Sequence, residues 1–229
     1  FGDSLTFWNS MVTHPDYDRF WKNRNPSVQL SNIEPAVLVT GGFYDAEDCY
    51  GAFRTYAELK KRSPKGNIFL AVGPWHHGGW GDRHVNSIAG AWFGEASGEF
   101  YQDKVEYPFF TYYLESKGNI PSKVNVLPSG ETQRSKMEGV PSAPRWETYS
   151  TWPPTEAKPF RINLSGIDSL NISEPASHAV FRSFTSDPSN PVPYMDVKSN
   201  GRDHGYMTAD QTFASRRHDV LTYSGKLLS

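Results

Sequence analysis

Ala36-Val-Leu-Val-Thr-Gly41 and Asn67-Ile-Phe-Leu-Ala-Val-Gly73 are the two apolar runs that decide the fold. Near-continuous apolar runs are typical of parallel strands that are covered on both faces. Between them, residues 48–62 carry apolar side chains at helical spacing and end in Lys60-Lys61-Arg62, which suits a helix C-terminus. A helix of about 15 residues covers roughly 22 Å, enough to start the second strand parallel to the first. We therefore predict a strand–helix–strand unit.

Polar residues follow each apolar run directly. Tyr44-Asp45-Ala46-Glu47-Asp48 comes after the first run, and Trp75-His76-His77 comes after the second. Ligands in open α/β sheets bind at the carboxyl ends of the strands, so we expect Asp45 and His77 to lie close together. An Asp that accepts a hydrogen bond from one imidazole nitrogen leaves the other nitrogen ready to take a proton from a nucleophile. The alternative is that Asp45 caps the following helix and His77 is a solvated or core histidine.

Acidic residues crowd the turn around Asp45. If Asp45 points at His77, then Glu47 and Asp48 are available to bind a substrate ammonium group, because close carboxylates repel one another unless a cation lies among them. The alternative is that these acids favour the helix N-terminus, whose free N–H groups and dipole attract them. Cys49 falls in the first turn of the same helix, where the dipole can lower a thiol pKa. A packed small hydrophobe is the simpler interpretation of Cys49.

The chain divides into three expected regions. Residues 1–33 are aromatic and polar, typical of the end of a helical cap region, with a short helix over 16–23. Residues 34–119 hold the strand–helix–strand unit, a Gly-rich loop, and a helix over 99–117 in which Pro108 predicts a kink or a late start. Residues 120–229 contain short alternating runs, typical of an antiparallel sandwich or jelly roll that is incomplete. The runs are 123–127, 145–149, 160–164, 178–184 and 220–223. We therefore predict an α/β fold followed by an all-β region.

Composition excludes several classes of function. The net charge of the 229 residues is −2, which gives no basic field for nucleic acid or an anionic membrane. No apolar run approaches the roughly 20 residues that span a bilayer. Cys49 is the one cysteine, so an internal disulfide is excluded. At 37% hydrophobic residues, the chain is expected to fold as a globular protein.

Two short motifs suggest other chemistry. Gly2-Asp3-Ser4-Leu5 spells the nucleophile block of the GDSL-type esterases, but their companion blocks for the oxyanion donors and the histidine are absent. His76, His77 and His84 suggest zinc, but adjacent histidines seldom converge on one metal, and no Glu lies at the helical spacing of the zinc proteases. We therefore expect no metal site, and a GDSL-type esterase that uses Ser4 is kept as a minor alternative.

Longer motifs resemble a known family. Gly41-Gly-Phe-Tyr-Asp-Ala-Glu-Asp-Cys-Tyr-Gly-Ala52, followed by Val72-Gly-Pro-Trp-His-His77, resembles the α/β-hydrolases that include α-amino acid ester hydrolases, cocaine esterase, glutaryl-7-aminocephalosporanic acid acylases and X-Pro dipeptidyl-peptidases. Further likenesses to the helical cap, the last hydrolase helix and the C-terminal jelly roll of this family lie at residues 14–21, 109–115, 186–193 and 217–223. The resemblance covers nearly the whole chain and implies an α/β-hydrolase sheet followed by a jelly-roll β-sandwich.

The resemblance also implies roles for named residues. Asp45 would be the triad acid, and His77, the last residue of Gly-Pro-Trp-x-His, would be the base. Glu47 and Asp48 match two carboxylates with which the amino acid ester hydrolases bind a substrate α-ammonium, and Tyr44 beside them is a further candidate for substrate binding. The expected substrates are small esters or amides, or short peptides. No metal or organic cofactor is implied.

The nucleophile of this family has no counterpart in the chain. It lies in a Gly-x-Ser-Tyr-x-Gly elbow upstream of the cap, and no Gly-x-Ser-x-Gly occurs here. We therefore expect a C-terminal fragment of a serine hydrolase, inactive alone, whose partner is the missing N-terminal half of the same protein. The resemblance favours a periplasmic or secreted bacterial location and is compatible with a homo-oligomer. The alternative is a non-catalytic β-sandwich that binds carbohydrate or protein, which Trp80, Trp92 and Trp152 on one exposed face would favour.

Overall fold

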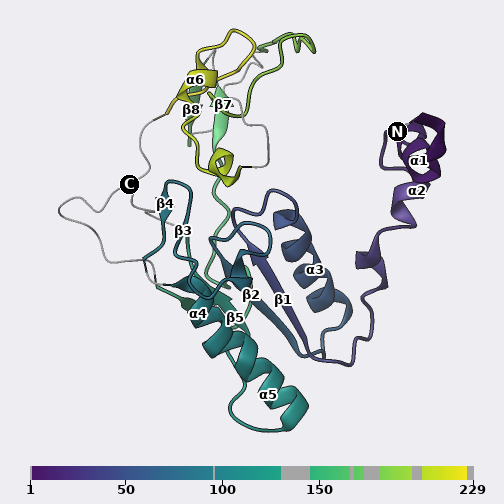
Figure 1. The fold of residues 1–229 in the computed structure, drawn as a ribbon, viewed down its shortest axis with the longest axis vertical. Coiled ribbons are helices and arrows are strands. Elements are labelled where there is room, and N and C mark those ends of the chain that lie inside the picture. The colour runs from purple at the N-terminus through teal and green to yellow at the C-terminus, as the bar shows by residue number, and fades with distance from the viewer. Residues whose placement is uncertain are drawn as a thin grey trace, which may run out of the picture.

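The computed structural model describes residues 2–94, 96–129, 145–165, 168–172, 181–197 and 203–225. Its centre is a four-stranded sheet in the order β1-β2-β5-β6. Helices cover both faces of this sheet, an N-terminal arm extends from one side of it, and a C-terminal part lies above it in the view of Figure 1. None of the described helices is long and apolar enough to cross a membrane.

The predicted strand–helix–strand unit is present. β1 (Val37–Gly42) and β2 (Ile68–Gly73) pair in parallel, from Val37 opposite Ile68 to Gly42 opposite Gly73. α3 (Cys49–Arg62) connects the two strands and ends in three cationic residues, which suit the negative end of the helix dipole. β2 is buried along its whole length, as expected for a parallel strand that is covered on both faces.

Two apolar clusters hold the layers together. On one face of the sheet, Tyr56 and Leu59 of α3 pack against side chains of β1, β2 and β5. On the other face, Ala71 of β2 and Trp75 just beyond it pack with Tyr101 and Val105. Burying one large apolar side chain stabilises a fold by about 1.5–3 kcal/mol, so these clusters are the main source of stability in the α/β core.

The second helical segment contains a π-helical turn. α4 (Ser97–Tyr101), the π-helical turn η4 (Gln102–Glu106) and α5 (Tyr107–Glu115) follow one another directly. Pro108 lies in the first turn of α5, and a proline there lacks the N–H that an uninterrupted helix would use. The sequence predicted a kink or a late start, and the chain instead widens into the π-helical turn just ahead of the proline.

The N-terminal arm consists of short elements. These are η1 (Gly2–Ser4), α1 (Thr6–Thr13), α2 (Arg19–Lys22) and η2 (Pro26–Gln29). Asp18 caps α2 by accepting a hydrogen bond from the backbone N–H of Phe20, which fixes the start of that helix within the predicted range 16–23. α1 and α2 stand away from the sheet (Figure 1).

Two runs that the sequence assigned to the all-β region join the central sheet instead. β5 (Val124–Val126) pairs in parallel with β2, and β6 (Glu147–Tyr149) pairs antiparallel with β5. A three-residue Val-Asn-Val run carries no feature that distinguishes a strand of a mixed sheet from a strand of a sandwich. In the folded chain, Val124 and Val126 are buried in the cluster formed with α3 and β2, and this burial places β5 in the central sheet.

The remaining elements are short. β3 (Ser87–Ile88) and β4 (Ala91–Trp92) form one hairpin, and β7 (Asn163–Ser165) and β8 (Ser169–Asn171) form another. η5 (His204–Met207) and α6 (Thr212–Ser215) follow. Residues 181–184 and 220–223 form no strand, and residues 178–180 of the predicted run lie outside the described part of the chain. The jelly roll is therefore not confirmed, and the division of the chain at residues 34 and 120 stays a prediction.

Candidate active site

Asp45 lies in the turn that follows β1 and is almost completely buried. Its Oδ1 accepts hydrogen bonds from the backbone N–H groups of Glu47 and Asp48, each at 2.9 Å. Its backbone carbonyl accepts a further bond from Cys49 N–H as α3 begins. Asp45 therefore fixes the entry into α3, which was the structural alternative considered for it, and still has Oδ2 available.

His77 engages that second oxygen. Its Nδ1 lies 3.0 Å from Asp45 Oδ2, and 47% of its side chain is exposed while that of Asp45 is 2% exposed. An ionised carboxylate only accepts hydrogen bonds, so this contact favours the tautomer with the proton on Nδ1. Nε2 is then left as an acceptor. The structure thus brings together the two side chains that the sequence placed at the ends of neighbouring strands.

A cleft opens beside this pair. It has a volume of about 820 Å³, and Asp45, Asp48 and His77 contribute to its wall. The rest of the wall comes from β1, from the first turns of α3, from Tyr17 and residues 25–27 of the N-terminal arm, and from Trp80. Among the described residues β1 pairs only with β2, so the cleft runs along an open edge of the sheet.

The three predicted substrate-binding residues occupy different places. Asp48 is exposed and lines the cleft with His77. Glu47 is exposed and is not among the residues that line the cleft. Tyr44 turns toward the β3–β4 hairpin, where its ring lies 6.1 Å from that of Phe93. The structure therefore brings only Asp48 of this set to the cleft.

Cys49 differs from the reactive thiol that a helix N-terminus can create. Burial raises the pKa of the Cys49 thiol above its ordinary value, and the nearby Asp45 carboxylate raises the pKa further. The helix dipole would lower the thiol pKa, but this effect is outweighed because a thiolate at this position would face the negative charge of Asp45. The simpler interpretation of Cys49 as a partly buried small side chain fits this environment.

His76 lies apart from the hydrogen bond between Asp45 and His77. Its Nδ1 is 3.0 Å from the carbonyl oxygen of His77, and its ring packs against that of His204, with 3.9 Å between the centroids. In the described part of the chain, no group of three or more His, Cys, Asp or Glu side chains is arranged to hold a metal ion.

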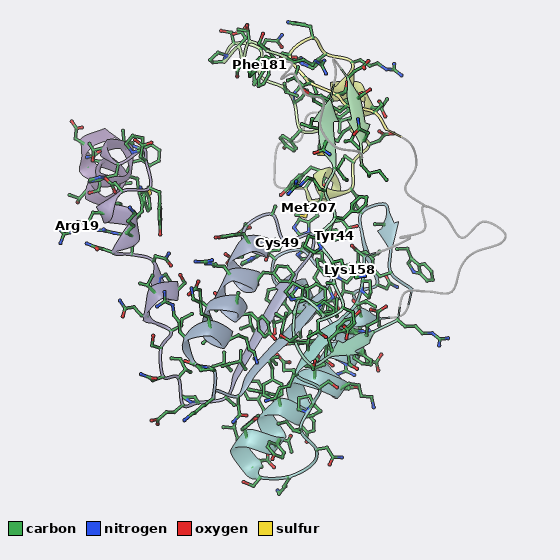
Figure 2. The ribbon with its side chains drawn as sticks, turned by 180° about the vertical axis from the view of Figure 1, so that it is seen from behind. Arg19, Tyr44, Cys49, Lys158, Phe181 and Met207 are labelled. Atoms are coloured by element: carbon green, nitrogen blue, oxygen red, sulfur yellow. The ribbon has the colours of Figure 1, made fainter. Side chains whose placement is uncertain are left out.

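The contact with His204 was not foreseen, because η5 lies more than a hundred residues beyond His76 in the sequence. Met207 of the same turn packs with Tyr44 against a cluster of Ile88, Ala91 and Phe93. Figure 2 shows Tyr44 and Met207 at this junction between the C-terminal part and the α/β core. A sequence pattern could not reveal this contact, since a four-residue turn has no period that points to a partner.

Comparison with known proteins finds relatives among hydrolases. The model of the X-Pro dipeptidyl-peptidase (S15 family) matches residues 2–79, the stretch that ends just after His77. A cocaine esterase from Rhodococcus sp. (strain MB1 Bresler) is 27% identical over 235 aligned residues, which cover 96% of this chain. The resemblance to this hydrolase family, predicted from the motifs, is confirmed.

Two solved structures share the fold over nearly the whole chain. An aminopeptidase from the marine sediment archaeon Thaumarchaeota archaeon is 27% identical and superposes with a TM-score of 0.80 over 98% of this chain. An α-amino acid ester hydrolase, 24% identical, shares the fold with a TM-score of 0.77 over 97% of the chain. The chain spans 37% of the length of the cocaine esterase and 36% of each solved structure.

Proposed function

We propose that this chain supplies the acid and the base of a serine hydrolase that cleaves esters or amides. The observation that carries the proposal is the hydrogen bond between His77 Nδ1 and Asp45 Oδ2 at the wall of the cleft. With Asp45 holding the imidazole, His77 Nε2 would take the proton of a serine as that serine attacks the substrate carbonyl. His77 would then give this proton to the leaving group, and water would release the acyl group from the serine. These steps require no metal or organic cofactor.

The nucleophile in this proposal lies outside the chain. The open edge of β1 supports this placement, because a further strand that pairs with β1 would pass along the cleft that His77 lines. A serine in the loop after a strand on this side of β1 would face His77, since catalytic groups of α/β sheets gather at the carboxyl ends of strands. The missing N-terminal half of the same protein is the proposed source, and we expect the chain alone to be inactive.

Asp48 is the best-placed candidate for recognising a substrate ammonium group. It is exposed, and it lines the same cleft as His77. A carboxylate at that position favours a substrate with a free amino group close to the scissile carbonyl, such as an amino acid ester, an amide or a short peptide. Glu47 and Tyr44 precede Asp48 in the same turn and are candidates for contacts outside the cleft.

Replacing each of the two adjacent histidines tests the proposal. In the protein with its upstream region, His77→Ala should reduce kcat for an amino acid ester by about a thousandfold or more, because the general base is lost. His76→Ala is the matched control and should keep kcat within about tenfold, because the His76 side chain contacts the His77 carbonyl and the ring of His204 instead of Asp45. Equal losses in the two variants would contradict the assignment of His77 as the base.

The non-catalytic alternative receives less support. Trp80, Trp92 and Trp152 are each half-buried and lie on different parts of the fold. Trp80 packs beside His77 and Trp75, and Trp152 packs against Phe53 of α3. They do not share an exposed binding face, and Trp80 instead forms part of the cleft wall next to His77. The GDSL-type alternative would place Ser4 in η1, within the N-terminal arm whose helices stand away from the sheet (Figure 1).

A further inference from the structure

Trp75 connects the end of β2 to the rest of the site. It is fully buried, two residues before His77. Its indole Nε1–H donates a hydrogen bond of 2.8 Å to Ser97 Oγ, and the Ser97 hydroxyl in turn donates a bond of 2.9 Å to the carbonyl oxygen of Val85. Ser97 is itself 2% exposed. The hydroxyl therefore accepts one bond and donates its single proton in another, which leaves it one orientation.

The backbone of Trp75 is tied to the loop that carries Asp45. Its carbonyl oxygen accepts a hydrogen bond of 3.1 Å from the N–H of Tyr44, the residue just before Asp45. A Cβ placed on Gly42 would lie 2.0 Å from that same oxygen, so the two loops approach more closely than any side chain at residue 42 would allow. A movement of Trp75 would therefore move His77 relative to Asp45.

The His77 side chain has few constraints of its own. It is half exposed, it bonds Asp45, and its ring meets the edge of Trp80 with 6.3 Å between centroids. The direction of the ring thus depends on the backbone that the buried Trp75 anchors. The position of the His77 ring matters because a shift of about 1 Å in a catalytic group can reduce a rate by roughly a hundredfold.

We propose that Ser97 is a positioning residue for His77, acting through Trp75. Ser97 fixes the indole, the indole fixes the chain at residue 75, and the chain holds the His77 ring at hydrogen-bond distance from Asp45. Ser97 touches neither substrate nor reacting atoms. The kinetic part of this proposal rests on the proposed function, whereas the effect on the His77 ring does not.

Ser63 offers a matched control at the opposite end of the sheet. It is also a buried serine whose hydroxyl accepts a backbone N–H, that of Ile33 at 2.9 Å, and donates to a backbone carbonyl, that of Leu30 at 2.9 Å. Ser63→Ala and Ser97→Ala therefore each remove one accepted and one donated hydrogen bond from a buried hydroxyl, and only Ser97→Ala removes a bond to Trp75. A merely structural role of Ser97 predicts equal effects of the two substitutions.

Nitrogen NMR of the 229-residue chain gives a readout that does not require catalysis. In Ser97→Ala, the ring ¹⁵N shifts of His77 should show a smaller fraction of the Nδ1–H tautomer, because the contact with Asp45 loosens. Ser63→Ala should leave the His77 signals unchanged at a similar loss of melting temperature. Ser97→Thr, which keeps the hydroxyl, should restore them. Should Ser97→Ala prove too unstable, Trp75→Phe removes the same indole bond and should reproduce its shift.

Kinetics of the protein with its upstream region gives the second readout. Ser97→Ala should lower kcat about tenfold to a hundredfold with KM within about twofold, because binding contacts are untouched while the base is displaced. Identical His77 spectra and identical kcat in Ser97→Ala and Ser63→Ala would overturn the proposal. Failure of the proposed function would look different, because hydrolysis would then be absent or independent of His77 while the comparison of His77 tautomers still stands.

Discussion

At the scale of single residues, Asp45 makes two kinds of contact with its two oxygens. Oδ1 holds the turn into α3 through two backbone N–H groups, and Oδ2 holds His77. An Asn at this position could keep the bonds to the turn but would present an N–H to His77, which forces the imidazole into the tautomer with its proton on Nε2. Asp45→Asn should therefore preserve local folding while leaving His77 Nε2 protonated and unable to act as the proposed base.

Cys49 is a natural reporter of the charge on Asp45. Because the Asp45 carboxylate helps to raise the thiol pKa, Asp45→Asn should lower that pKa and speed alkylation of Cys49 by iodoacetamide near pH 8. The rate should rise by up to about tenfold for a change of about one pKa unit. The measurement is clean because the chain contains one cysteine.

Asp48→Asn removes an equal charge from the neighbouring position and serves as the control for that experiment. It should change the alkylation rate less, because Asp48 is exposed to solvent and Asp45 is buried. Equal acceleration in the two variants would mean that the thiol senses the general charge of the turn and that Asp45 has no special effect.

At the scale of elements, α3 is held by a buried carboxylate between two cations. Glu58 is 5% exposed, and its oxygens lie 2.8 Å from Arg54 Nη2 and 2.6 Å from Arg62 Nε, one helical turn away on either side. The hydrogen bond from Arg62 lowers the pKa of Glu58 most, and the charge of Arg54 lowers it further, against the opposing effect of burial. α3 therefore carries an ion network that spans two of its turns.

This network predicts a pH dependence of stability. The pKa of Glu58 is lower in the folded chain than its ordinary value of 4.5, so its contribution is present above pH 4.5 and is lost as the pH falls through the lowered pKa. Glu58→Gln should therefore reduce the free energy of unfolding at pH 7, with the difference from the unaltered chain shrinking below pH 4. Urea unfolding at both pH values measures this difference.

Glu115→Gln supplies a comparison for the α3 experiment, since it removes an exposed carboxylate that pairs with Lys117. Exposed pairs contribute little, so its unfolding curves should stay close to those of the unaltered chain at both pH values. A gap between Glu58→Gln and the unaltered chain that persists unchanged at low pH would contradict the ionic explanation.

Elements of this fold were predictable where the sequence signal was long. The apolar runs before Asp45 and His77, and the periodic segment between them, predicted β1, α3 and β2 to within one residue at every end. β5 and β6 have three residues each, too few for a period to reveal which sheet they join. The π-helical turn before Pro108 could not be predicted either. A proline indicates that the helical hydrogen bonding is interrupted, but packing decides whether the helix kinks, starts late or widens into a π-helical turn.

At the scale of the whole molecule, burial is concentrated in the first part of the chain. Among the described residues, every buried apolar side chain except Ala214 lies at or before Leu127. Many large apolar side chains of the later part are exposed, and Phe181 is 90% exposed. Local stability follows buried apolar contact, so the two parts should differ in how readily they open.

Hydrogen exchange should report this difference. The amides of β2 should exchange slowest, because the strand is buried on every residue and pairs on both sides. The described residues 181–197, which form no helix or strand, should exchange within seconds to minutes. Mass spectrometry of peptic fragments measures both rates in one sample, and slow exchange over 181–197 would show that this segment is covered in solution by contacts absent here.

Only part of the candidate site could be predicted from the sequence. Asp45 and His77 were foreseen because each follows a strand directly, and the geometry of parallel strands brings their ends together. Ser97 and His204 were not foreseen, since they approach the site from α4 and η5 through packing between distant segments. Side chains that touch the reacting groups through a third residue leave no local pattern in the sequence.

The open edge of β1 has a consequence for handling the protein. Val37–Gly42 contains no lysine, proline or bulge, the devices with which natural edge strands discourage pairing with other molecules. A strand of this composition, with one row of backbone groups facing outward, is a template on which a second molecule can add a strand. Separated from the rest of a larger sheet, the chain would therefore tend to associate with a second copy through β1, and its solubility would depend on what covers this strand.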